Sequence, residues 1–148
     1  MNEKQSLKEK VLALIDKSDS KVNPFSLSTI DAEGYPSIRM MGIFFRDGLD
    51  IYLNSRCPSK KLDQIEKNPK ISLFFHSPGY TELLSYFGTA ELVEVPEERA
   101  RAWERFPEAL RKYHSGPQSP NLAIIRIEPV RLEYTDRQNK QGAITLLP

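Results

Sequence analysis

The segment that decides the fold runs from Ile51 to Pro69 and reads Ile-Tyr-Leu-Asn-Ser-Arg-Cys-Pro-Ser-Lys-Lys-Leu-Asp-Gln-Ile-Glu-Lys-Asn-Pro. Its first part predicts a strand, and Ser59 is the kind of residue that begins a helix. Lys60 and Lys61 are poorly placed in a first helical turn, because a helix N-terminus already carries partial positive charge. A bound phosphate would compensate, since backbone N–H groups, a hydroxyl and two ammonium groups would converge on it. The segment therefore predicts either an anion site or two solvated surface lysines.

Composition predicts one ordinary globular domain over residues 1–148. Twenty-one basic and twenty acidic residues leave a net charge of +1, which argues against a nucleic-acid partner. The charged N-terminus does not resemble a signal peptide, and no apolar run approaches the roughly 20 residues that span a bilayer. Cys57 is the single cysteine, so no intrachain disulfide can form and a cytoplasmic location is expected.

Hydrophobic periodicity predicts helical regions at 6–17, where Ser6 begins a capping box, at Ser59–Asn68, and at 96–114, which Pro107 splits. Six segments read as strands joined mainly by short turns: 24–30, 37–45, 49–54, 70–76, 83–95 and 121–134. Gly88 marks a bulge in the fifth strand, and Pro129 interrupts the sixth. The tail, 136–148, is expected to dock on the surface. The pattern describes an α+β protein, mainly antiparallel β, whose six strands form a small barrel with peripheral helices.

Motifs for several kinds of chemistry are missing from the sequence. His76, His114 and Cys57 lack metal-ligand spacing, so no metal site is expected. No nucleophile elbow, Walker motif or Gly-x-Gly-x-x-Gly stretch is present. An oligonucleotide-binding barrel remains an alternative, because aromatic residues on strands can stack on bases: Phe44, Phe45, Tyr52, Phe74 and Phe75. Core packing and the balanced charge both argue against it.

Arg39 strengthens the anion-site interpretation. In a meandering sheet, the strand that carries Arg39 should lie beside the strand that carries Tyr52 and Asn54, across the Asp47-Gly48 turn. Counting back from that turn places Arg39 near Ser59, where its planar guanidinium could bind a phosphate.

The order of these motifs resembles the flavin-binding split barrels related to pyridoxamine 5′-phosphate oxidase, and in particular their general-stress-protein branch. The resemblance covers about residues 5–135. Its elements in this chain are Arg39-Met40-Met41, Tyr52-Leu53-Asn54, Ser59-Lys60-Lys61, Asn68-Pro69, Gly88-Thr89-Ala90, Trp103, Phe106-Pro107, Gly116-Pro117 with Pro120, and Ile125-Arg126-Ile127-Glu128-Pro129.

The resemblance implies a homodimer with flavin mononucleotide (FMN) at the subunit interface. It implies that Arg39, Ser59, Lys60 and Lys61 hold the flavin phosphate. Backbone groups of two residues would lie along the isoalloxazine ring, with three more residues beneath it: Met40 and Met41, then Tyr52, Leu53 and Asn54.

Departures from the family pattern narrow the implied activity. Phe44 stands where a pyridoxamine phosphate oxidase carries a substrate-binding lysine, and Leu83 stands where a glutamine contacts the flavin. The late Trp-Gln and Arg-x-His motifs of those enzymes are missing. The expectation is therefore a flavin-dependent oxidoreductase of another substrate, with no catalytic residue assigned. The alternative is a non-catalytic module, with a stress-response or storage role, that binds flavin or haem.

Overall fold

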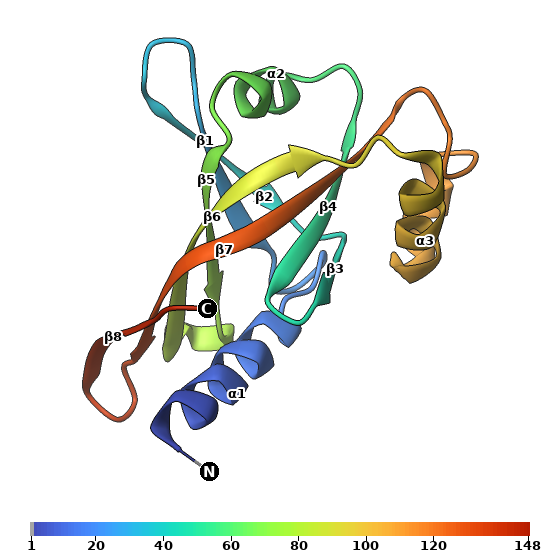
Figure 1. Ribbon diagram of the computed structural model, residues 1–148. Coiled ribbons are helices and arrows are strands. Elements are labelled where there is room, and N and C mark those ends of the chain that lie inside the picture. The colour runs from blue at the N-terminus through green and yellow to red at the C-terminus, as the bar shows by residue number, and fades with distance from the viewer. Residues whose placement is uncertain (1) are drawn as a thin grey trace.

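The computed structural model describes residues 2–148 and confirms the predicted mixture of helices and antiparallel strands (Figure 1). Within these residues three α-helices accompany the sheet: α1 (Glu3–Asp16), α2 (Lys60–Lys67) and α3 (Pro96–Arg105). Two short 3-10 helices are η1 (Pro78–Tyr80) and η2 (Glu108–Lys112). The described strands number eight and not six: β1 (Phe25–Ile30), β2 (Pro36–Met41), β3 (Phe44–Asp47), β4 (Asp50–Arg56), β5 (Lys70–His76), β6 (Glu82–Leu92), β7 (Leu122–Asp136) and β8 (Gln141–Leu146).

The sheet curls into a half-barrel whose two edge strands are consecutive in sequence. The strand order is β2-β1-β5-β6-β7-β4-β3, with β8 paired to β7. Only Gly42 and Ile43 separate β2 from β3, and so short a connection spans at most about 11 Å. The ends of β2 and β3 therefore lie close together although no ladder joins them. We call this gap the split.

The predicted continuous strand 37–45 is therefore wrong, because the chain changes strand at Gly42. A Cβ atom on Gly42 would lie 2.4 Å from the Cα of Ser20, so a larger residue would force the two backbone segments apart. The expected pairing of the Arg39 strand with the Tyr52 strand is also wrong. β2 pairs with β1, where Arg39 lies opposite Leu27, whereas β4 pairs with β3 and β7.

The late part of the sheet differs from the prediction in three ways. β7 continues through Pro129, because the proline lies opposite Gly88 at a bulge where the ladder with β6 is already irregular. Its first half pairs with β4 and its second half with β8. The tail docks as β8, a strand that the sequence analysis missed because its apolar residues form a short run without clear alternation. The predicted fifth strand, 83–95, ends earlier, at Leu92.

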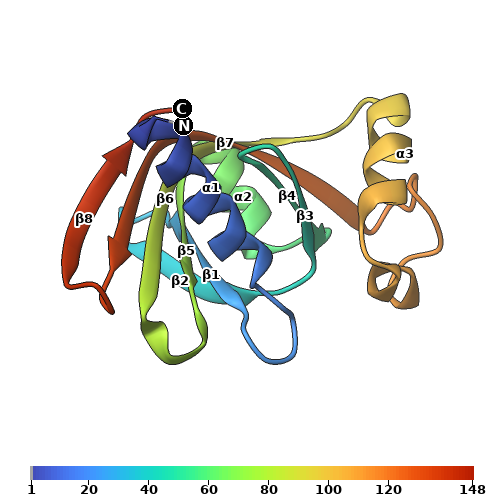
Figure 2. The ribbon, with the colours of Figure 1, turned by 90° about the horizontal axis from the view of Figure 1, so that it is seen from below.

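The helices close the barrel at its ends and widen one side (Figures 1 and 2). α1 crosses one end, and α2 caps the other, where it packs on β1 and β6. α1 begins with Asn2 as its N-cap and not with Ser6: the Asn2 side chain accepts a 2.8 Å bond from the Gln5 amide. Pro107 separates α3 from η2 as predicted. No helix within residues 2–148 has the length and apolar character to cross a bilayer.

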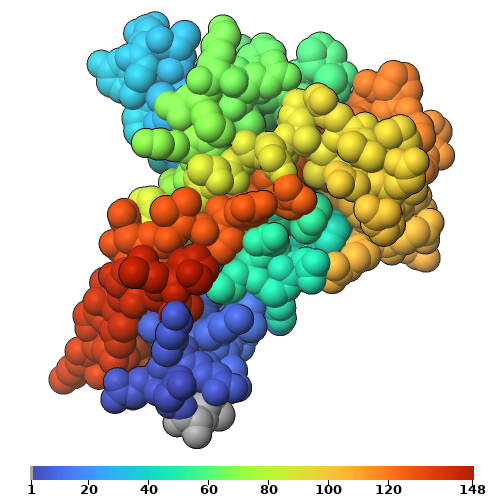
Figure 3. All heavy atoms as spheres, viewed as in Figure 1, coloured from blue at the N-terminus to red at the C-terminus, as the bar shows by residue number. Residues whose placement is uncertain are grey.

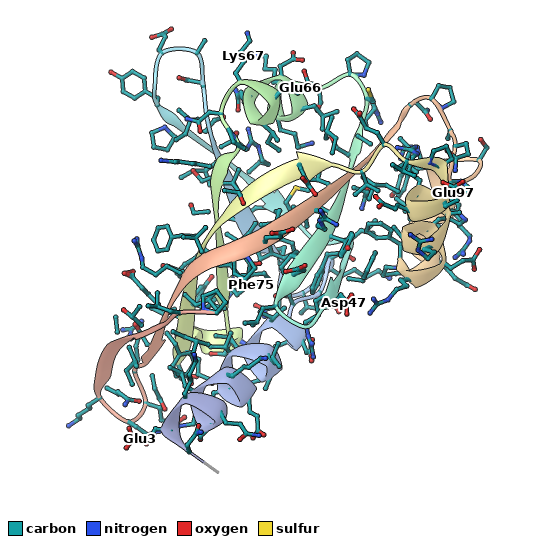
Figure 4. All side chains as sticks on the ribbon, in the orientation of Figure 1. Glu3, Asp47, Glu66, Lys67, Phe75 and Glu97 are labelled. Atoms are coloured by element: carbon teal, nitrogen blue, oxygen red, sulfur yellow. The ribbon has the colours of Figure 1, made fainter. Side chains whose placement is uncertain are left out.

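Two apolar clusters account for the packing. The larger fills the barrel, where Phe75 lies inside the curled sheet (Figure 4) and Phe25 stacks on it. The smaller attaches α3 and η2 to the outer surface of β3, β4 and β7, and it produces the lobe at one side of the molecule (Figure 3). Its fully or nearly buried members are Val93, Ala102, Trp103, Phe106, Leu110, Leu122 and Ile124. The barrel and the lobe thus present two different surroundings for polar side chains.

Candidate functional site

A cluster of hydroxyl and ammonium groups lies where β4 passes into α2. The Ser59 side chain caps the helix by accepting a 3.4 Å bond from the Leu62 amide. Its Oγ lies 3.1 Å from the Oγ of Ser55, and the Lys61 Nζ donates to that same Ser55 Oγ at 3.0 Å. The predicted helix start at Ser59 is confirmed. Lys61 therefore turns back over the helix N-terminus toward the end of the barrel.

Arg39 reaches the same end of the barrel from β2. Its guanidinium donates to the Oγ1 of Thr29 at 2.7 Å, to the Oγ of Ser37 at 3.1 Å and to the Oε1 of Gln64 at 3.3 Å. Gln64 lies on α2, and its Oε1 also accepts a hydrogen bond from Thr29. The sequence predicted that Arg39 lies near α2, although through the wrong strand pairing. Arg39 does lie near α2, because α2 packs across β1. We call Arg39, Ser55, Ser59 and Lys61 the phosphate cradle, after the ligand predicted for it from the sequence.

The electrostatics of the cradle favour an anion. Burial lowers the pKa of Arg39. Burial also lowers the pKa of Lys61, and repulsion from Arg39 lowers it further. Within residues 2–148 neither cation forms an ion pair with a carboxylate, and all the hydrogen-bond acceptors of Arg39 are neutral. Two cations that repel each other without a protein counter-ion are stabilised by a bound anion.

Only one of the two predicted lysines takes part in the cradle. Lys60 is exposed and lines a separate hollow beside Asp31, Asp63 and Lys67. The neighbouring residues Lys60 and Lys61 point in different directions because successive positions on a helix are about 100° apart. Lys61 is therefore the better candidate for a phosphate contact, a choice that the sequence left open.

A groove lies at the split, where β2 connects to β3. Its volume is about 370 Å³, and its lining comes from β2, from the connection to β3, from β4 and from the segment after α1: Ser20, Pro24, Met40, Met41, Gly42, Ile43 and Asn54. Asn54 donates a 3.0 Å bond to the carbonyl oxygen of Ile43, which fixes the connection between β2 and β3. Met40 follows Arg39 on β2 and Asn54 precedes Ser55 on β4, but consecutive strand residues face opposite sides of the sheet. Met41 is the groove residue on β2 that faces the same side as Arg39.

Two residues predicted for this site direct their side chains elsewhere. Leu53 is completely buried in the barrel core. Tyr52 lies on the outer surface, where its ring stacks on Phe45 at a centroid distance of 4.4 Å. The nine predicted site residues therefore fall into three groups. The cradle contains Arg39, Ser59 and Lys61; the groove contains Met40, Met41 and Asn54; and the side chains of Tyr52, Leu53 and Lys60 lie outside both.

Four polar residues that complete the cradle were not predicted from the sequence: Thr29, Ser37, Ser55 and Gln64. Ser55 is 3% exposed and Thr29 is fully buried. Both occupy inward-facing positions of strands whose other inward residues are apolar, such as Leu27 and Leu53. A polar residue at an inward position was a signal available in the alternating pattern, because burial of a hydroxyl requires a hydrogen-bond partner.

The family model for pyridoxamine 5′-phosphate oxidase matches residues 7–136 of the chain. General stress protein 26 of Bacillus subtilis is 33% identical over 128 residues, which is 84% of this chain and 85% of that protein. The pyridoxine/pyridoxamine 5′-phosphate oxidase of Dichelobacter nodosus is 32% identical over 91 residues, but these are only 41% of its length. The chain therefore spans most of the stress protein and less than half of that oxidase.

Solved structures of similar fold include general stress protein 26 of Bacillus anthracis, with a TM-score of 0.75, 24% identity, and coverage of 96% of this chain and 98% of that one. A pyridoxamine 5′-phosphate oxidase-related, FMN-binding protein of Nostoc punctiforme has a TM-score of 0.69 and 16% identity, and the match covers 95% of both chains. A haem-binding protein of Mycobacterium smegmatis has a TM-score of 0.77 and 16% identity, and the match covers 95% of this chain and 57% of that one. With the half-barrel and the extent of the family match, these similarities show that the chain belongs to the pyridoxamine 5′-phosphate oxidase family of split barrels.

Proposed function

We propose that this protein binds FMN, with the phosphate in the cradle and the ring system along the groove at the split. The observation that carries the proposal is the convergence of Arg39 and Lys61 on hydroxyl groups without a carboxylate partner in the described chain. A phosphate dianion would supply the missing counter-charge, and Ser55 and Ser59 would donate to its oxygens. The FMN-binding neighbour from Nostoc punctiforme adds support at the level of the fold.

The proposed activity is that of a flavin-dependent oxidoreductase whose substrate is not pyridoxamine 5′-phosphate. The bound flavin would carry out the electron or hydride transfer, and the protein would bind and orient it. By the family resemblance, Phe44 stands where pyridoxamine phosphate oxidases carry the lysine that contacts the substrate phosphate. Its ring packs edge-on against Phe25 at 5.1 Å and belongs to the barrel core. A cationic substrate contact at this position would require the core to be rebuilt.

Binding without catalysis is the second candidate, and haem is the alternative ligand because a haem-binding protein shares the fold. The position of the histidines favours flavin over haem. His76 stacks on Tyr80, and His114 is hydrogen-bonded to Asn121; neither lines the groove at the split. The described groove offers no imidazole as an axial ligand, whereas the cradle is suited to a phosphate.

The proposal includes a homodimer with the flavin at the subunit interface, in the cytoplasm. β2 is an edge strand, and its exposed apolar residues support such an interface: Ile38 is 69% exposed and Met40 is 58% exposed. An edge strand with apolar side chains favours association with another chain. Because Met40 also lines the groove, pairing along this edge would cover the proposed ring site.

The decisive experiment compares FMN with riboflavin, which has the same ring but no phosphate. Isothermal titration should show that FMN binds at least tenfold more tightly, because each charge-assisted hydrogen bond contributes about 1.5–3 kcal/mol. The absorption spectrum of the purified protein identifies a retained flavin or haem. Equal affinity for FMN and riboflavin would contradict the placement of the phosphate. Oxidation of a reduced nicotinamide by the flavin-loaded protein would distinguish an oxidoreductase from a binding module.

A further inference from the structure

A second polar hollow lies between α3 and the outer surface of the barrel. It has a volume of about 270 Å³, and we call it the α3 hollow. The helix contributes Glu98, Arg101, Ala102 and Arg105, which follow the i, i+3, i+4, i+7 spacing of one helix face. None of the residues of the phosphate cradle lines it. The α3 hollow is therefore a separate feature of the outer surface.

The sheet side of the α3 hollow is an aromatic and cationic wall. Phe45, Tyr52 and Arg126 are cross-strand neighbours, so their side chains form a row on one face of β3, β4 and β7. The rings of Phe45 and Tyr52 stack with an interplanar angle of 7°. The guanidinium of Arg105 lies 4.8 Å from the centroid of the Phe45 ring. The wall thus combines two stacked rings with positive charge, and the Phe45 ring is covered by Tyr52 and Arg105.

The arginines of the α3 hollow have unused hydrogen-bonding capacity. The Nε of Arg126 is buried and has no hydrogen-bond partner, although its Nη2 pairs with Glu91. Arg101 is exposed and forms no ion pair within residues 2–148. Arg105 has a loose ion pair with Asp47, at 3.6 Å, and donates a 3.0 Å bond to the carbonyl oxygen of Arg46. Buried donors without partners are rare in proteins, so the Nε of Arg126 is an unsatisfied polar group beside the hollow.

One arginine of the α3 hollow has no carboxylate partner within residues 2–148. Arg105 pairs with Asp47, and Arg126 pairs with Glu91 and Glu128, which lie outside the lining, so Arg101 is the arginine of the lining that is free to bind an anion. A single carboxylate would match Arg101, and a planar ring beside that carboxylate would lie against Tyr52. The volume of about 270 Å³ suits a ligand with one ring better than a dinucleotide.

We propose that the α3 hollow binds small planar carboxylates with one aromatic ring. Guanidinium groups hold the carboxylate by paired N–H donors, and the aromatic wall contacts the ring face. This site does not depend on flavin binding, because its charges belong to different residues from those of the phosphate cradle. It gives the protein a second specificity, for aromatic acids, on the outer surface of the barrel.

The test is a titration of the full chain with benzoate, followed by amide chemical shifts. Benzamide, which has the same shape without the charge, and cyclohexanecarboxylate, which has the charge without the aromatic ring, are the comparison ligands. We expect benzoate to shift the amides of α3, β3 and β4 around the hollow and to bind more tightly than either comparison ligand. Equal binding of benzamide, or shifts confined to Arg39 and Lys61, would overturn the proposal.

Two variants with opposite expected effects test the charges. Arg101→Gln should weaken benzoate binding by about tenfold, because it removes a cation that has no partner of its own. Asp47→Asn should strengthen it several-fold, because Arg105 is then released from its carboxylate partner. Arg111→Gln is the matched control: Arg111 lies over the Trp103 ring but does not line the hollow. If Asp47→Asn weakens binding, or if Arg101→Gln leaves it unchanged, the assignment is wrong.

Discussion

The phosphate cradle and the α3 hollow both gather cations, but they differ in what balances the charge. In the cradle, Arg39 and Lys61 have only neutral partners, such as Thr29 and Ser55. In the hollow, Arg105 and Arg126 each have a carboxylate partner. Figure 4 shows one of these carboxylates, Asp47, at the β3–β4 hairpin on the side that faces α3. The same residue types therefore form one region whose cations lack a counter-charge and another whose cations mostly have one.

This difference indicates how strongly each region should depend on its ligand. Uncompensated cations that are partly buried destabilise the free protein, so a bound anion recovers free energy. Cations that already have carboxylate partners gain less, because a ligand must compete with those partners. The cradle is therefore expected to bind a dianion tightly, and the α3 hollow to bind a monoanion weakly. The following predictions test that contrast, beginning with the largest expected effect.

The double variant Arg39→Ala with Lys61→Ala should abolish FMN binding and leave the fold intact. Loss of two charge-assisted contacts corresponds to at least a hundredfold lower affinity, by about 1.5–3 kcal/mol for each contact. Thr29 and Gln64 still bond to each other in this variant, so the barrel end remains closed. Flavin fluorescence titration measures the affinity, and circular dichroism monitors the fold. Lys60→Ala is the control; retention of full affinity by the double variant would refute the cradle.

Lys61→Met should weaken FMN binding by about tenfold and yet stabilise the free protein. Methionine keeps most of the buried chain length but removes the charge that Arg39 repels. We expect the free energy of unfolding to rise by about 0.5–2 kcal/mol, as measured by urea denaturation. Lys60→Met should change it by less than about 0.5 kcal/mol, because Lys60 is exposed. A loss of stability in Lys61→Met would mean that the charge is compensated in the free protein.

Alkaline pH should weaken FMN binding by removing the proton of Lys61. The folded pKa of Lys61 lies below its ordinary value of 10.5, because of burial and then because of Arg39. Between the folded pKa and 10.5 the unfolded chain binds more protons, so the stability of the free protein rises with pH through this window. The affinity for FMN falls through the same window by several-fold. Lys61→Met should lack this dependence, and an identical pH profile in that variant would exclude Lys61 as its source.

Arg105→Gln should have the smallest effect. The substitution removes an exposed ion pair with Asp47, an exposed bond to the Arg46 carbonyl oxygen and a contact with the Phe45 ring, which together contribute about 1–2 kcal/mol. The melting temperature should therefore fall by only a few degrees, and the affinity for FMN should not change. A clear loss of FMN affinity would show that the α3 lobe and the cradle are coupled, which would contradict the separation of the two regions.

The cradle shows why sequence reasoning reached part of the site and not the rest. Ser59, Lys60 and Lys61 are adjacent in sequence, so the helix start and its unusual charges were visible directly. Arg39 was placed near them by counting back from the Asp47-Gly48 hairpin along a strand that is not continuous, because Gly42 sends the chain to the opposite edge of the sheet. The approach of Arg39 to Lys61 depends on α2 packing across β1. No local pattern encodes that contact.

The sequence by itself determined the alternating strands, the helix start at Ser59, the split helix at Pro107 and the bulge at Gly88. These features follow from side-chain period, capping and backbone restriction, which act over a few residues. Only the tertiary structure decided that Lys61 rather than Lys60 faces Ser55, and that the two edges of the sheet meet at Gly42. It also decided that Tyr52 belongs to the α3 lobe. Such contacts are selected by burial between segments distant in sequence, and burial is a property of the whole packed chain.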